Sequence, residues 1–192
     1  MAGLDEAGRG PLAGPVVAAA VFLQKNSRIN LKINDSKKLS EKQREFFYEK
    51  LTKHKDIKWG IGIVSEKIID NTNILQASKL AMKKAYSNVL KNYGVSFLLI
   101  DGNFRLDTNI PQRSIIKGDG KVFSIAAAGI IAKVTRDRLM QKMHKTYPQY
   151  DFAKHKGYGT ALHIKHLKTF GPCKIHRKTF WPVSGFKKAP LT

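Results

Sequence analysis

Acidic residues are scarce in this chain, which has 14 Asp and Glu against 35 Lys and Arg and a formal net charge of +21 at pH 7. Such an excess of positive charge favours a polyanionic partner, because each phosphate that a Lys or Arg neutralises releases condensed counterions. The charge alone does not separate a specific role on nucleic acid from that of another basic protein, such as a ribosome-associated or a secreted one.

Cysteine is rare in this chain, and long apolar runs are absent from its sequence. The single cysteine, Cys173, excludes an intrachain disulfide and fits a reducing cytoplasm. No secretory signal opens the chain, because the acidic Asp5 and Glu6 follow Met1 almost directly. The longest apolar stretch, roughly residues 12–23, is too short and too interrupted by glycine and proline to span a bilayer. We therefore expect a cytoplasmic protein without a membrane segment.

What the chain does contain suits a globular α/β protein. Its 192 residues fit one domain or one domain with a small appendage, and 42% apolar residues suffice for a core. Apolar runs bounded by turn residues predict strands at residues 2–4, 16–22, 58–64, 95–100 and 113–116. Apolar residues at helical spacing predict helices at about residues 40–51, 73–92 and 123–144. This order indicates a mixed sheet with helices on its faces.

Capping residues mark two of these helix starts, and a change of composition marks the end of the core. Ser40 and Gln43 fit a capping box, and Thr72 or Asn73 can cap the second helix. Beyond Pro148, aromatic and basic residues interleave. We interpret residues 1–147 as the core and residues 148–192 as a small helical appendage that completes the binding cleft, with an exposed basic helix at residues 160–169.

Four of the few acidic residues stand where predicted elements begin or end. Asp5 and Glu6 adjoin a glycine-rich turn, Asp101 ends a strand, and Asp119 precedes a helix. Converging carboxylates suit Mg²⁺ or Mn²⁺, and two such ions can stabilise both the attacking and the leaving oxygen of a phosphodiester. Neighbouring residues of a regular strand point to opposite faces, so Asp5 and Glu6 can share a site only if the strand ends or twists there. The alternative is that each acid caps a helix or pairs with a lysine.

Other polar residues have simpler interpretations. Asp137 lies among basic residues within the last long helix, which predicts an ordinary surface ion pair. His163-x-x-His166 followed by Cys173-x-x-His176 has the spacing of a zinc site. Only one thiolate is present, however, and the first two histidines fit the exposed basic helix, so we do not predict zinc.

Several segments, in order along nearly the whole chain, closely resemble the ribonuclease HII family. The first is Gly3-Leu4-Asp5-Glu6-Ala7-Gly8-Arg9-Gly10-Pro11 with its continuation to Val17, and another long one runs from Ser124 to Asp137. The shorter segments are 35–40, 100–102, 117–119, 155–160 and 176–180. The two long segments are too extensive for a chance match.

The resemblance implies a ribonuclease H-like fold, with a mixed sheet of about five strands flanked by helices. It implies an endonuclease that hydrolyses the RNA strand of RNA/DNA hybrids and cuts on the 5′ side of ribonucleotides embedded in duplex DNA, as in ribonucleotide excision repair, leaving 3′-hydroxyl and 5′-phosphate ends. The cofactor would be Mn²⁺ or Mg²⁺, with two ions during catalysis. The family's metal-binding, catalytic acids fall on Asp5, Glu6, Asp101 and Asp119.

The resemblance also implies the substrate contacts of a monomer that binds nucleic acid. Its Gly-Arg-Gly motif falls on Gly8, Arg9 and Gly10 and reads the 2′-hydroxyl, the group that distinguishes RNA from DNA. The motif tyrosine falls on Tyr158 and stacks on the deoxyribose beside the cut, with a core tyrosine as the alternative. The residues expected to hold backbone phosphates are Ser36, Lys37 and Lys38, with a solvated approach to the helix as the alternative.

Two departures from the family pattern stand out. Gly129 occupies a position where family members usually carry serine, so a hydroxyl contact from that helix is absent. Met1 lies only four residues before Asp5, a shorter lead than relatives usually have, which indicates either a short first strand or a start that is trimmed or misassigned.

Three rival hypotheses stay open. Another nuclease or integrase-type enzyme of the same fold would share the acids but lack the reader at Gly8, Arg9 and Gly10. A non-catalytic nucleic-acid-binding protein would show no loss of activity on replacing Asp101. A basic structural protein would show no dependence on divalent metal.

Overall fold

The computed structural model describes residues 1–24, 29, 31, 33, 39–90 and 93–186. Its centre is a five-stranded sheet in the order β3-β2-β1-β4-β5. The strands are β1 (Ala2–Ala7), β2 (Val16–Leu23), β3 (Ile57–Val64), β4 (Leu98–Asp101) and β5 (Gln112–Ile115). Because β1 pairs antiparallel with β2 and parallel with β4, the sheet is mixed, as the sequence predicts.

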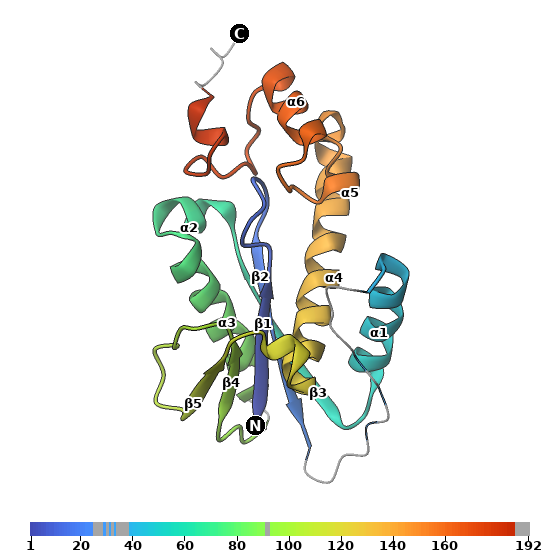
Figure 1. The fold of residues 1–192 in the computed structure, drawn as a ribbon, viewed down its shortest axis with the longest axis vertical. Coiled ribbons are helices and arrows are strands. Elements are labelled where there is room, and N and C mark those ends of the chain that lie inside the picture. Colours follow the sequence, from blue (N-terminus) through green and yellow to red (C-terminus); the bar gives the residue numbers. More distant parts are fainter. Residues whose placement is uncertain (25–28, 30, 32, 34–38, 91–92, 187–192) are drawn as a thin grey trace.

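Helices cover both faces of this sheet (Figure 1). α3 (Ile74–Leu90) and the short α2 (Glu66–Asn71) lie on one face, whereas α4 (Phe123–Thr146) and α1 (Glu41–Lys53) lie on the other. Neighbouring residues of β2 enter the two separate cores, Ala18 on the side of α3 and Ala19 on the side of α4. Burial on both faces explains why β2 is a continuous apolar run rather than an alternating one.

Capping side chains fix where two helices begin. Ser40 forms both bonds of the predicted capping box with Gln43 at the start of α1. At the start of α3, Oδ1 of Asn73 accepts a hydrogen bond from the N–H of Gln76 at 2.9 Å. The sequence did not predict α2, because its 6 residues are too few to show a helical period.

The first strand is longer than the sequence predicts. Its antiparallel pairing with β2 continues to Ala7, so β1 includes Asp5 and Glu6, and the expected strand end at Asp5 is wrong. The parallel pairing with β4 stops earlier, at Leu4 and Ile100. One edge of β1 is therefore free of β4 where its two acids lie.

Gly3 sets the close approach of β1 to α4. A Cβ atom there would lie 2.4 Å from the backbone carbon of Ser124 and 2.5 Å from the backbone nitrogen of Ile125. Because backbone atoms cannot move aside as a flexible side chain does, we expect Gly3→Ala to lower the free energy of unfolding by about 2 kcal/mol in urea denaturation. Gly94→Ala is the control, since a Cβ there meets no atom within 4 Å, and equal losses would contradict the packing argument.

The C-terminal segment gathers at the end of the sheet where the β1–β2 loop lies (Figure 1). Its elements are η3 (Pro148–Tyr150), α5 (Phe152–His155), α6 (Ala161–Phe170) and η4 (Val183–Gly185). Tyr150 and Phe152 share a core with Ala13 of the loop and Met140 of α4. The expected exposed helix is α6, but His163 on it is fully buried, so that expectation is wrong for this residue.

The boundary between residues 147 and 148 stays a prediction.

Among the helices of the described residues, none combines the length and apolar character needed to cross a bilayer.

Candidate functional site

A pocket of about 430 Å³ lies where β1 and β4 end, beside α4. Its lining comprises Asp5, Glu6, Ala7, Gly8, Arg9, Gly10, Arg44, Asp101, Gly129, Lys133 and Tyr158. Of the predicted site residues that the structure describes, only Asp119 is not part of this lining. Three further predictions, at Ser36, Lys37 and Lys38, lie outside the described residues.

Sheet register brings Asp5 and Asp101 together. Leu4 pairs with Ile100, so the next residue of each parallel strand occupies a matching position and faces the same way. Asp5 is 8% exposed, and its Oδ1 accepts a hydrogen bond from the N–H of Glu6 at 2.7 Å. Oδ1 of Asp101 accepts a hydrogen bond from the N–H of Gly118, also at 2.7 Å.

Glu6 reaches the pocket although it follows Asp5 in a regular strand. Its Oε1 pairs with Nη1 of Arg9 at 3.3 Å, and its side chain is 9% exposed. Its Oε2 is buried and accepts no hydrogen bond from any residue that the structure describes. One carboxylate oxygen is thus left with unused acceptor capacity in a buried place.

Asp119 belongs to a short turn next to these acids. It is buried within the 3-10 helix η2 (Gly118–Gly120), which follows Lys117 in a left-handed conformation with a φ of 55°. The turn is joined to β4 by the hydrogen bond between Gly118 and Asp101. Asp119 is therefore close to the pocket without lining it.

The four acids repel one another. Burial raises the pKa of Asp5 well above its usual value, and the charges of Glu6, Asp101 and Asp119 raise it further. Burial also raises the pKa of Glu6, although the guanidinium of Arg9 partly offsets the effect. Both shifts disfavour the ionised carboxylates unless an opposing divalent charge is close to them.

The donor set fits a hard divalent cation. Carboxylate oxygens are the ligands that Mg²⁺ and Mn²⁺ prefer, and a bound cation would relieve the repulsion and use the buried Oε2 of Glu6. Within the described part of the chain, no three His, Cys, Asp or Glu side chains are already arranged to hold an ion. One oxygen each of Asp5, Glu6 and Asp101 accepts a hydrogen bond from the protein.

Cations line the same pocket. Besides Arg9, which was predicted, these are Arg44 of α1 and Lys133 of α4, which were not. Lys133 could have been found from its spacing, because it stands one helical turn after Gly129 on the same face of α4. No sequence pattern connects Arg44 to the site, since its position depends on how α1 packs against α4.

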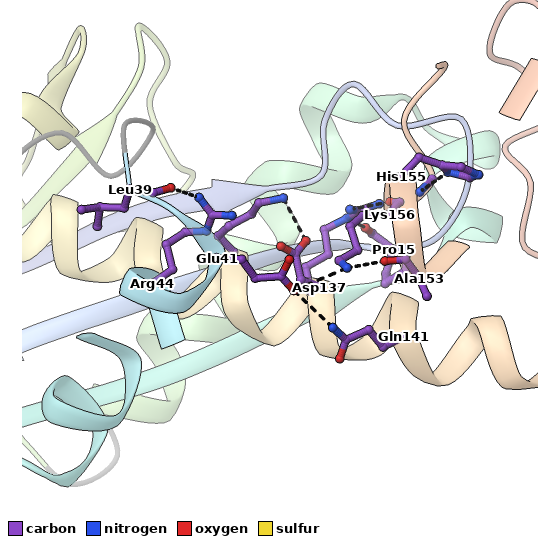
Figure 2. Close-up of polar contacts among 12 residues, drawn as sticks. Pro15, Leu39, Glu41, Arg44, Asp137, Gln141, Ala153, His155 and Lys156 are labelled. Atoms are coloured by element: carbon purple, nitrogen blue, oxygen red, sulfur yellow. Dashed lines mark hydrogen bonds and ion pairs between the residues drawn. The ribbon is translucent and has the colours of Figure 1, made fainter. Parts of the chain in front are cut away.

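Polar contacts tie α1 to α4 and to the C-terminal segment beside the pocket (Figure 2). Oε1 of Glu41 accepts a hydrogen bond from Gln141 at 3.3 Å and lies 3.6 Å from Nζ of Lys156. Asp137, also drawn there, pairs with Lys133 at 2.9 Å. This ion pair was predicted for the surface, which is wrong, because Asp137 is 5% exposed and packs within the structure.

Tyr158 forms part of the pocket wall and is 40% exposed, so the core alternative does not hold. Nζ of Lys133 lies 5.3 Å from the ring centroid and Cζ of Arg136 lies 5.8 Å from it, which are cation–π distances. The N–H of Tyr158 donates to His155, and its carbonyl accepts from Nδ1 of His163, both at 2.9 Å. The backbone of Tyr158 is thus fixed while its ring stays accessible.

Three of the four residues with zinc-like spacing, His163, Cys173 and His176, form a chain of hydrogen bonds. Nε2 of His163 and Nε2 of His176 lie 3.0 Å apart, and Nδ1 of His176 accepts from the N–H of Cys173 at 2.9 Å. A carbonyl can only accept, so Nδ1 of His163 carries the proton that bonds to Tyr158, and His176 donates to His163. Both imidazoles are neutral in this arrangement, and His166 is not part of it.

The sequence matches the family model described as Ribonuclease HII over residues 2–183. Among similar proteins, the ribonuclease HII of Bacillus cytotoxicus is 53% identical over 191 residues, which are 100% of this chain and 72% of that protein. The ribonuclease HII of Chlamydia trachomatis serovar L2 is 54% identical over 183 residues, which are 95% of this chain and 82% of that protein.

Solved structures show the same fold. The ribonuclease H2 of Pyrococcus horikoshii has a TM-score of 0.74 and 26% identity, covering 96% of this chain and 95% of that one. The RNase HII of Archaeoglobus fulgidus, solved in complex with PCNA, has a TM-score of 0.76 and 26% identity, covering 93% and 94%. The chain belongs to the ribonuclease HII family of metal-dependent endonucleases, which hydrolyse the RNA of RNA/DNA hybrids.

Proposed function

We propose that this enzyme cuts on the 5′ side of ribonucleotides embedded in duplex DNA as well as within RNA/DNA hybrids, leaving 3′-hydroxyl and 5′-phosphate ends. The observation that carries the proposal is the pocket itself. It combines the acids of β1 and β4 with the glycine-flanked loop at Gly8, Arg9 and Gly10 and with the exposed ring of Tyr158. Acids, loop and ring together could hold one phosphodiester and the sugars on either side of it.

Asp5, Glu6, Asp101 and Asp119 would hold two divalent ions, Mn²⁺ or Mg²⁺. Bound there, such ions supply an activated water and stabilise the charge on the leaving oxygen. The acids would bind and orient the ions, and the raised pKa values of Asp5 and Glu6 mean that protons would leave these two side chains when an ion binds. A site so negative needs nearby cations to admit a phosphate backbone, and Arg9, Arg44 and Lys133 line the same pocket.

The loop and the tyrosine would supply the choice of substrate. Backbone groups of Gly8, Arg9 and Gly10 can approach a 2′-hydroxyl closely, because no side chain stands between at the glycines. Tyr158 would stack on the deoxyribose beside the cut. Phosphate contacts by Ser36, Lys37 and Lys38 stay a prediction, as do the monomeric state and the cytoplasmic location.

A DNA duplex with one ribonucleotide tests the proposal directly. In Mg²⁺ or Mn²⁺ we expect one cut on the 5′ side of the ribonucleotide, no cut in an all-DNA duplex, and no cut in chelator. Cleavage of a long RNA/DNA hybrid without any cleavage at the single ribonucleotide would refute the cut beside embedded ribonucleotides and leave only the hydrolysis of RNA/DNA hybrids. Cleavage that persists in chelator would overturn the role of the four acids.

Tyr158→Ala should lower kcat/KM at a single embedded ribonucleotide by roughly tenfold, which corresponds to about 1.4 kcal/mol, because it removes the ring that would contact the deoxyribose. Tyr158→Phe is the matched control, since it keeps the ring and should retain nearly the full rate. If both variants cleaved at the wild-type rate, the ring would have no part in recognition. Steady-state cleavage of a labelled duplex is the measurement.

A further inference from the structure

Two arginines, Arg136 of α4 and Arg177 of the C-terminal segment, are fully buried. Neither forms an ion pair with a carboxylate among the described residues, and their hydrogen bonds go to backbone carbonyls instead. Burying a charge costs several kcal/mol unless it is well satisfied. The carbonyl bonds satisfy both guanidinium groups and join α4 and the C-terminal segment to the β1–β2 loop.

The guanidinium of Arg177 spans the β1–β2 loop. Nη2 donates to the carbonyl of Gly8 at 2.6 Å, Nη1 to that of Arg9 at 2.9 Å, and Nε to that of Gly14 at 3.0 Å. The backbone N–H of Arg177 also donates to the carbonyl of Leu12 at 2.8 Å. One residue near the C-terminus therefore holds both ends of the loop.

These bonds determine where the N–H groups of the loop point. In a trans peptide the C=O and the following N–H point in opposite directions. Because the carbonyls of Gly8 and Arg9 face the buried guanidinium, the N–H groups of Arg9 and Gly10 face away from it. Neither N–H donates to another residue within the described parts of the chain, and Gly8, Arg9 and Gly10 all line the pocket.

We propose that Arg177 is a positioning residue for ribonucleotide recognition, which presents the N–H groups of Arg9 and Gly10 to the 2′-hydroxyl and the phosphate of the bound strand. This inference rests on the proposed function. Arg177 itself does not reach the pocket and acts only through the peptide planes that it orients.

The chemistry of the side chain supports this role. A guanidinium has five donors in a fixed planar fork and can bridge three carbonyls, whereas an ammonium is a point charge without that geometry. Burial, followed by repulsion from Arg136, lowers the pKa of Arg177 to about 9, which still leaves it protonated at neutral pH. The conformation also depends on glycine at position 8, where φ is 99° and a Cβ would lie 2.1 Å from Nε of Arg136.

Arg177→Lys tests the proposal, because it keeps the charge and removes the fork. In an Asp101→Asn background, which should slow cleavage by roughly three orders of magnitude, we would measure the ratio of Kd values for an all-DNA duplex and the same duplex with one ribonucleotide. Arg177→Lys should lower this preference about tenfold and leave the affinity for the all-DNA duplex within about twofold. A folded Arg177→Lys protein with an unchanged ratio would overturn the proposal.

Tyr150→Phe controls for a loss of stability in the C-terminal segment. It removes the hydrogen bond from the Tyr150 hydroxyl to the carbonyl of Gly171 at 2.7 Å and should lower Tm without changing the ratio. If the ratio fell equally in Tyr150→Phe, the role of Arg177 would be merely structural and the proposal would fail.

A second measurement applies if Arg177→Lys does not fold. In the Asp101→Asn protein, the amide resonances of Arg9 and Gly10 should shift more with the ribonucleotide duplex than with the all-DNA duplex, and equal shifts would overturn the proposal. A parent protein that shows no preference for the ribonucleotide would instead overturn the proposed function itself. The two failures are therefore distinguishable.

Discussion

Asp101→Asn should reduce cleavage by roughly three orders of magnitude while duplex binding stays the same or becomes tighter. A catalytic ion and its ligands contribute several kcal/mol to the reaction, and each 1.36 kcal/mol is a factor of ten in rate. The amide oxygen can still accept the hydrogen bond that Asp101 accepts from Gly118, so the fold should be retained. Binding is preserved because the substitution removes a negative charge that repels phosphate.

Asp107→Asn is the matched control, because Asp107 is an exposed acid a few residues beyond the same strand. Single-turnover cleavage and fluorescence anisotropy on the same duplex give the two quantities. The metal site proposed at Asp101 would be refuted if Asp101→Asn cleaved at the rate of the control. Loss of both cleavage and binding would indicate unfolding, which circular dichroism would detect.

Stability should fall steeply between pH 6.5 and pH 4, because of the buried histidine pair. Burial lowers the pKa of His163 to about 4 and that of His176 to about 3. Repulsion from His163 also lowers the pKa of His176. Below pH 6.5 both histidines bind protons in the unfolded chain but not in the folded protein, so acid favours unfolding. His163 alone should cost about 3 kcal/mol by pH 4, at 1.36 kcal/mol for each pKa unit.

His163→Gln removes the titrating group and should flatten the fall, as measured by urea denaturation at a series of pH values. His54→Gln is the control, because His54 lies at the end of α1 outside the pair. The pKa values of Asp5 and Glu6 are raised in the folded protein, so the protonation of these two acids at low pH favours the folded state. The difference between the stability curves of the wild type and His163→Gln therefore isolates the contribution of His163. Parallel curves for the wild type and His163→Gln would show that the pair does not control acid stability.

Local patterns in the sequence were enough to predict most of the fold. The apolar runs and the Ser40 capping box located the strands of the sheet and the start of α1, because these features depend on neighbouring residues. Pairing partners decided what the patterns could not. β1 extends past Asp5 because β2 continues to pair with it, and no feature of residues 2–7 alone reveals that.

The site was predictable to the extent that it depends on recognisable motifs. The acids and Tyr158 were named from their segments, but Arg44 and the burial of His163 result from packing between elements distant in the sequence. Arg177 lies in a segment that was recognised without any role for it. Its bonds to Gly8 and Arg9 join opposite ends of the chain, and periodicity within a window cannot detect such contacts.

The β1–β2 loop depends on a residue that is far away in the sequence, because Arg177 lies 169 positions after Gly8, whose carbonyl it binds. The carbonyls of Gly8 and Gly14 can bond to Arg177 only after that later part of the chain has been translated. Contacts between such distant residues carry a large loop-closure entropy and form late in folding. A chain that ended before residue 177 would therefore lack the bonds that orient the carbonyls of Gly8 and Arg9.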